Sequence, residues 1–189
     1  MPQDSINLSE VLSMIVHTAI EKCDLFSHID LTKCQICISS SRSGRGGIYG
    51  KLVPLRFENG ERTLIYRGKK YSIPQIFVKN IEILYIVYFY MPKFFNLSAK
   101  DKLNVIFHEL YHISPEFNGD IRRMGKVKAA HGHSKKHYDT NYEKELNEFF
   151  TYIEQTPFMN FLLLDEKGLK KNFKKIKSTR MKLPKPVIV

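Results

Sequence analysis

The chain has 189 residues, of which 43% are hydrophobic, so it can bury a core and is most simply one domain. No apolar run reaches the length of a membrane-spanning helix, and no basic stretch precedes a hydrophobic one at the start, so we expect a soluble, cytoplasmic protein. The net charge of +11 is uneven, since residues 1–166 carry only +2, which argues against a uniformly basic nucleic-acid-binding domain.

The N-terminal part predicts a helix followed by a strand. Asn7 is placed to cap a helix whose apolar residues recur at helical spacing over residues 8–20. Residues 33–39 alternate like a strand, on which Cys34 and Cys37 point to opposite faces. We therefore expect this lone Cys-x-x-Cys pair to form neither a disulfide nor a metal site.

The middle of the chain predicts β-structure. The glycine-rich residues 40–47 lack the ending and the following helix of a phosphate-binding P-loop, and we interpret them as a turn. Asn59-Gly60, between residues 49–57 and 62–66, predicts a two-residue hairpin. Residues 83–91, rich in β-branched and aromatic side chains, predict a buried strand. If that strand is central, the edge on which an extended peptide can lie must come from the hairpin.

The most informative stretch is His108-Glu109-Leu-Tyr-His112. A cap at Ser98 and a stop at Pro115 predict that it is helical, so the two histidines lie one turn apart and can hold one metal ion. Glu109 is then placed to take a proton from water at the metal, which is the arrangement of zincin peptidases.

A catalytic zinc ion needs a third protein ligand. We favour His131, just ahead of a second predicted helix, over His133 and His137. A glutamate ligand ranks lower and would have to come from that helix, at Glu143, Glu145 or Glu148.

Five further polar residues have two interpretations each. Asp120 could orient a ligating imidazole and Arg122 or Arg123 could stabilise an oxyanion, but a simple Asp–Arg pair is at least as good an explanation. Tyr138 could donate to the oxyanion and Asp139 could orient a ligand, or both could hold two helices together.

The C-terminal part predicts a helix over residues 142–152 and then a basic extension over residues 167–189. The extension holds nine Lys or Arg and no acidic residue up to position 185. Leu169, Phe173 and Ile176 are spaced as on an amphipathic helix, which could contact nucleic acid, an acidic partner or a membrane.

The run from His108 to Arg123, followed by Ala130-His131-Gly-His133-Ser134 and Tyr138-Asp139, resembles a family of metallopeptidases of bacteria and bacteriophages, which is similar in turn to the small SprT-like zincins. The resemblance covers about residues 26–186. It implies an α+β zincin-like domain with an N-terminal helix, a small mixed or antiparallel sheet and a helix after the active-site helix. It also implies a zinc-dependent hydrolase with Glu109 as base.

Our leading hypothesis is a zinc peptidase in which His108, His112 and His131 bind Zn²⁺ and Glu109 is the general base. The second is a nucleic-acid-associated protein in which zinc is structural, with His133 or Asp139 as fourth ligand, and the basic tail supplies affinity. A zinc hydrolase for another amide, as in the cell wall, is the third.

Overall fold

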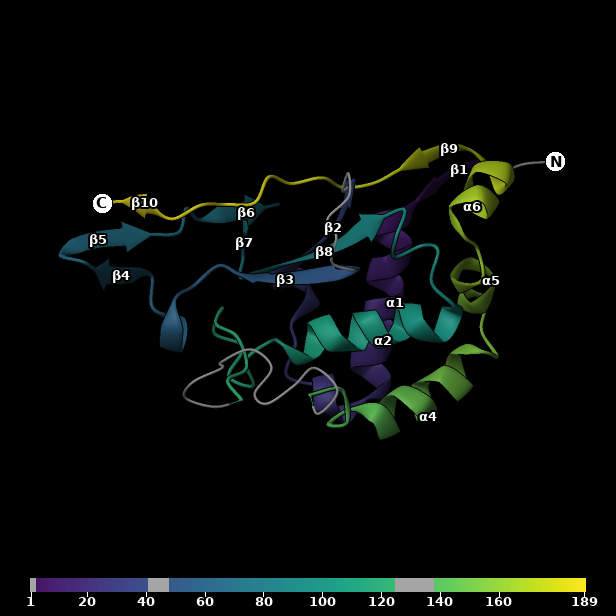
Figure 1. Ribbon diagram of the computed structural model, residues 1–189, viewed down its shortest axis with the longest axis horizontal. Coiled ribbons are helices and arrows are strands. Elements are labelled where there is room, and N and C mark those ends of the chain that lie inside the picture. Colours follow the sequence, from purple (N-terminus) through teal and green to yellow (C-terminus); the bar gives the residue numbers. More distant parts are fainter. Residues whose placement is uncertain (1–2, 41–47, 125–137) are drawn as a thin grey trace.

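The computed structural model describes residues 3–40, 48–124 and 138–189, and it is a mixed α+β fold, as the sequence predicts (Figure 1). The helices are α1 (Leu8–Lys22), α2 (Ala99–Tyr111), α4 (Glu143–Ile153), α5 (Phe158–Leu162) and α6 (Glu166–Asn172). The strands are β1 (Gln3–Asn7), β2 (Cys34–Ser40), β3 (Gly50–Pro54), β4 (Thr63–Tyr66), β5 (Lys69–Ser72), β6 (Ile76–Val78), β7 (Ile81–Ile83), β8 (Tyr85–Met91), β9 (Phe173–Lys177) and β10 (Val187–Ile188).

The central sheet has the strand order β2-β8-β3, with β8 parallel to β2 and antiparallel to β3. The buried strand predicted over residues 83–91 is confirmed as β8, and its residues 85–89 are buried. Because β8 is central, β3 forms one edge of this sheet.

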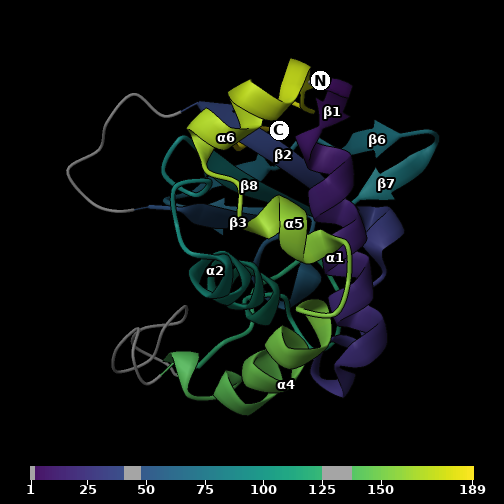
Figure 2. The ribbon, with the colours of Figure 1, turned by 90° about the vertical axis from the view of Figure 1, so that its right-hand side faces the viewer.

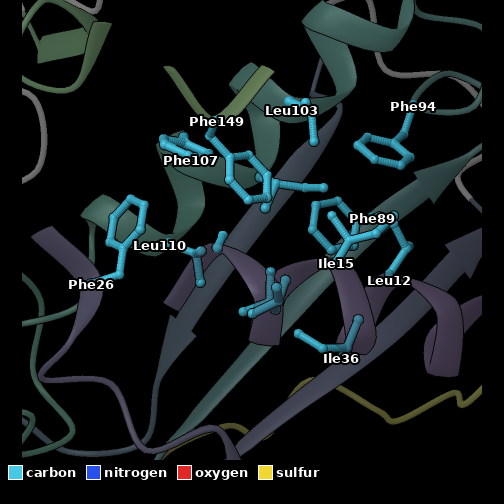
Figure 3. Close-up of a cluster of buried hydrophobic side chains, with 14 of the residues drawn as sticks. Leu12, Ile15, Phe26, Ile36, Phe89, Phe94, Leu103, Phe107, Leu110 and Phe149 are labelled. Atoms are coloured by element: carbon cyan, nitrogen blue, oxygen red, sulfur yellow. The ribbon is translucent and has the colours of Figure 1, made fainter. Parts of the chain in front are cut away.

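Helices α1, α2 and α4 lie on one side of the sheet (Figure 2). The Asn7 side chain accepts a hydrogen bond from the Ser9 amide at 3.2 Å, which confirms the predicted helix start. Phe107 of α2 packs edge-on against Phe26 with ring centroids 5.0 Å apart, and it also contacts Phe149 of α4 (Figure 3). These aromatic contacts join the helical layer into one apolar core.

The other face of the sheet has its own apolar cluster. Cys37 and Ile86 lie there under the β6–β7 hairpin, together with Met181 from the C-terminal segment. Cys34 packs instead against the helical side. The two thiols thus point to opposite faces, as the strand pattern predicts.

The predicted hairpin at Asn59-Gly60 is wrong, because the strands on either side of the turn do not pair with each other. Both residues have positive φ, at 58° and 78°, so a tight turn does form there. However, β3 pairs with β8, and β4 pairs with β5 in a separate sheet. Strand β3 therefore pairs with the distant strand β8 and not with its neighbour in sequence, β4. The Arg56 amide, just after β3, likewise donates to a distant group, the Gly119 carbonyl, at 3.0 Å.

The basic C-terminal segment is in contact with the rest of the chain. Phe173 and Ile176 lie on β9, which pairs in parallel with β1, so the amphipathic helix predicted through these residues is wrong beyond Asn172. Further along, the Thr179 carbonyl accepts from the Ile38 amide at 3.0 Å, and β10 pairs with β5. The predicted division into a domain of residues 1–166 and an extension of residues 167–189 stays a prediction.

Candidate metal and catalytic site

Helix α2 carries the predicted site residues. Its Ser98 side chain accepts from the Asp101 amide at 3.1 Å, which confirms the predicted cap, and the helix ends at Tyr111, ahead of Pro115. His108 and Glu109 on this helix and His112, which caps its C-terminal end, are buried, each with 6 to 7% of its surface exposed. Such low exposure for three polar side chains indicates that each has a specific partner.

The two imidazoles face each other. The Nε2 atoms of His108 and His112 are 3.1 Å apart. Two imidazole nitrogens on one tetrahedral ion, each at about 2.0–2.1 Å, would be about 3.3 Å apart. The pair therefore fits two ligands of a single zinc ion without rearrangement of the helix.

Groups from the start of the α4 region hold the other nitrogen of each ring. The Asp139 carboxylate is 2.8 Å from Nδ1 of His108, and the Tyr142 hydroxyl donates to the same carboxylate at 2.7 Å. The Tyr138 hydroxyl is 2.9 Å from Nδ1 of His112, and its ring stacks on that imidazole. Such outer contacts fix the orientation of ligating histidines.

These contacts constrain where protons lie. A carboxylate only accepts, so Nδ1 of His108 carries the proton and its Nε2 presents a lone pair. Burial raises the pKa of the Tyr138 and Tyr142 phenols well above the usual value, and for Tyr142 the hydrogen bond to Asp139 adds to this. Both phenols therefore stay protonated at neutral pH, and Tyr138 can either donate to His112 or accept from it.

Glu109 points toward the edge strand of the central sheet. Its Oε2 accepts a hydrogen bond from the Leu52 amide of β3 at 2.7 Å. A Cβ at the neighbouring Gly50 would lie 2.9 Å from Cγ and Oε1 of Glu109 and 2.9 Å from Cγ1 of Val105. The glycine thus leaves the space that this carboxylate occupies.

The charged residues of the loop after α2 contact other residues of the protein. The Asp120 carboxylate accepts a hydrogen bond from the Asn59 amide at 2.9 Å, and it also accepts from Nε and Nη2 of Arg123. The Arg122 guanidinium lies 4.2 Å over the Tyr111 ring and donates to the Tyr111 carbonyl. For Asp120 and Arg123 the simple ion pair is therefore the better interpretation.

The predicted third metal ligand lies outside the residues that the structure describes. His131, His133 and His137 all lie outside the described residues. Within residues 3–40, 48–124 and 138–189, no group of three or more His, Cys, Asp or Glu side chains could share a metal ion. Glu145 and Glu148 line a hollow with residues 22–25 on another side of α4 and are poor candidates.

Three site groups were not predicted from the sequence. Gly50 and the Leu52 amide lie more than fifty residues before Glu109, and no local pattern marks a contact between an edge strand and a helix. Tyr142 follows Asp139 at helical spacing, which could have indicated that the two side chains meet.

Comparison with known proteins identifies a family. A family model described as "Putative phage metallopeptidase" matches residues 6–149, which include α1, the central sheet, α2 and most of α4. No curated protein and no solved structure matches. In the part of the chain that the structure describes, every helix is too short or too polar to traverse a membrane.

Proposed function

Because the chain belongs to the family described as "Putative phage metallopeptidase", we propose that it is a zinc-dependent peptidase with its active site on α2. The observation that carries the proposal is the 3.1 Å approach of the Nε2 atoms of His108 and His112, with Glu109 beside them. We propose His131 as the third ligand. Zinc bound there would supply Lewis acidity, which acidifies water and polarises a carbonyl group.

The residues of the chain have separate tasks in this proposal. Glu109 accepts the proton of the attacking water and passes it to the leaving amine. The Leu52 amide holds the Glu109 carboxylate, and Asp139 and Tyr138 hold the two imidazoles with Nε2 outward. Holding the base and the metal ligands in their orientation before the substrate binds accounts for a large part of the rate enhancement at such a site.

Within the described residues, no strand pairs with the edge of β3 that faces away from β8, and we propose this edge as the place for an extended substrate. Gly50 and Leu52 point their backbone groups away from β8, because the pairing with β8 uses the alternate residues. The Leu52 amide is already bonded to Glu109, so we propose the Gly50 backbone groups and the Leu52 carbonyl for pairing with the substrate. An extended peptide can pair with such an edge through its main chain, which tolerates many sequences. Protein or peptide substrates therefore suit the site.

The alternative of a closed, structural zinc site gains no support from the family. It needs a fourth protein ligand, for which the sequence offers His133 or Asp139. Asp139 contacts Nδ1 of His108, on the side of the ring away from Nε2, which disfavours it as a ligand of the same ion.

Two substitutions test the peptidase. Glu109→Gln should keep stoichiometric zinc and lose about 10²- to 10⁴-fold in hydrolysis of fluorescein-labelled casein, since only the proton acceptor is removed. His112→Ala should lose the metal, as measured by elemental analysis. Glu154→Gln, at an exposed glutamate that follows α4, is the matched control and should match the wild type. Undiminished turnover in Glu109→Gln would refute the assignment.

A further inference from the structure

The C-terminal segment fixes a row of basic side chains on the surface. We define the basic band as the six residues Lys174, Lys175, Lys177, Arg180, Lys182 and Lys185, all of which are exposed. The segment runs along one side of the molecule from α6 to β10, on the side away from α4 (Figure 1). The band is thus separate from the site on α2.

The backbone under the band is held in place. Strand β9 pairs with β1, the Thr179 amide donates to the Ser9 hydroxyl at 3.0 Å, and the Tyr88 hydroxyl donates to the Met181 carbonyl at 3.2 Å. The basic side chains therefore project from a backbone that is held in place, on β9 for the first three of them and in the extended segment after it for the others. Binding a partner would not require this backbone to become ordered first.

The charges of the band are mostly uncompensated. Within the described residues, Lys174 has a carboxylate partner, Asp4 at 2.9 Å, and no ion pair is found for the other five. No acidic residue follows Glu166 in the sequence. A second copy of the chain would bring charges of the same sign together, so the partner must be anionic.

The shape of the band favours a linear polyanion over a membrane. At about 3.3 Å per residue, the segment from Lys174 to Lys185 reaches up to about 36 Å, comparable with about ten nucleotides of one duplex strand. Binding at a lipid surface also needs apolar side chains exposed among the basic ones. Between Lys174 and Lys185, Ile176 and Met181 are half-buried against the fold and Leu183 is the one exposed large apolar side chain, so the band itself offers little apolar surface; the exposed Val187, Ile188 and Val189 lie beyond it.

We propose that the basic band binds the phosphate backbone of nucleic acid, without sequence specificity, at a surface distinct from the peptidase site. The contacts are charge-assisted interactions of Lys and Arg with phosphate oxygens, which release counterions. The peptidase could in this way act while bound to nucleic acid.

The test compares two triple variants of equal charge. One carries Lys177→Gln, Arg180→Gln and Lys182→Gln, and the control carries Lys22→Gln, Lys100→Gln and Lys144→Gln on the helical layer, where all three lysines are also exposed. Binding of a fluorescein-labelled 20-nucleotide DNA, single-stranded and duplex, is measured by anisotropy between 50 and 200 mM NaCl. Equal thermal midpoints show that both variants fold.

A plot of log affinity against log salt concentration should be less steep for the band variant. The magnitude of its slope should fall by about 2 to 3, at 0.7 to 0.9 for each lost phosphate contact. The control should keep the wild-type slope, and Glu109→Gln should bind as the wild type does, which separates this proposal from the peptidase. Equal losses in both triple variants would overturn it, as would absence of DNA binding by the wild type. Binding to phosphatidylserine vesicles with none to DNA would overturn it in favour of a membrane.

Discussion

The substitution Gly50→Ala tests how the edge strand positions the catalytic base. The new Cβ would lie 2.9 Å from two atoms of the Glu109 side chain and 2.9 Å from Val105. Carbon atoms pack at about 3.5–4.0 Å, so the side chains must give way by roughly 0.6–1 Å. The β-branched Val105 side chain is stiff, whereas the longer Glu109 side chain can rotate about several bonds, so we expect the carboxylate to move.

A shift of this size has two measurable effects. Misplacement of a catalytic group by about 1 Å can reduce kcat/KM by about 10²-fold. The Leu52 amide would lose its acceptor, and with the overpacking this should lower the free energy of unfolding by about 1–3 kcal/mol. Zinc content should not change, because the three atoms nearest to the new methyl group belong to Glu109 and Val105 and not to an imidazole.

Casein hydrolysis, zinc analysis and urea unfolding measure the three quantities on the same preparation. Lys51→Ala is the control, since Lys51 is exposed on the same strand and its side chain points to the other face. A folded, zinc-loaded Gly50→Ala protein with kcat/KM within about twofold of wild type would show that Glu109 does not depend on this gap.

Three further outcomes follow from a site residue and from groups whose pKa burial shifts. Asp139→Asn should weaken zinc binding by about 10- to 100-fold, measured by chelator competition, and an unchanged affinity would contradict its orienting role. Burial lowers the pKa of Lys102 to about 8, below its unfolded value, so its contribution to stability should rise with pH between about 8 and 10. In urea unfolding, the stability of the wild type relative to Lys102→Met should increase by up to about 2 kcal/mol from pH 7.5 to 9.5, and a constant difference would refute the shift. Burial raises the pKa of Cys34 to about 12 and that of Cys37 to about 11, so at pH 8 a thiol reagent should modify these cysteines only after unfolding; rapid labelling of the native protein would argue otherwise.

Local patterns were sufficient where local physics decides the structure. The cap at Ser98, the stop before Pro115 and the spacing of His108 and His112 are properties of one helix, and the structure confirms the helix. The opposite faces of Cys34 and Cys37 follow in the same way from the strand period.

Long-range pairing could not be predicted in this way. The turn at Asn59-Gly60 has the conformation that its sequence favours, yet the strands on either side of it belong to different sheets. The contact of Glu109 with β3 likewise depends on which strand lies at the sheet edge, which no local pattern determines. Tyr138 was a candidate oxyanion donor, whereas its hydroxyl meets Nδ1 of His112.

The parallel pairing of β1 with β9 joins the two ends of the chain. The first strand finds its partner only when residues 173–177 have been made, and Met181 then covers the second apolar cluster. During synthesis, β1 therefore cannot reach its native pairing until residues 173–177 have left the ribosome, so this part of the fold forms after translation of the segments between the two strands.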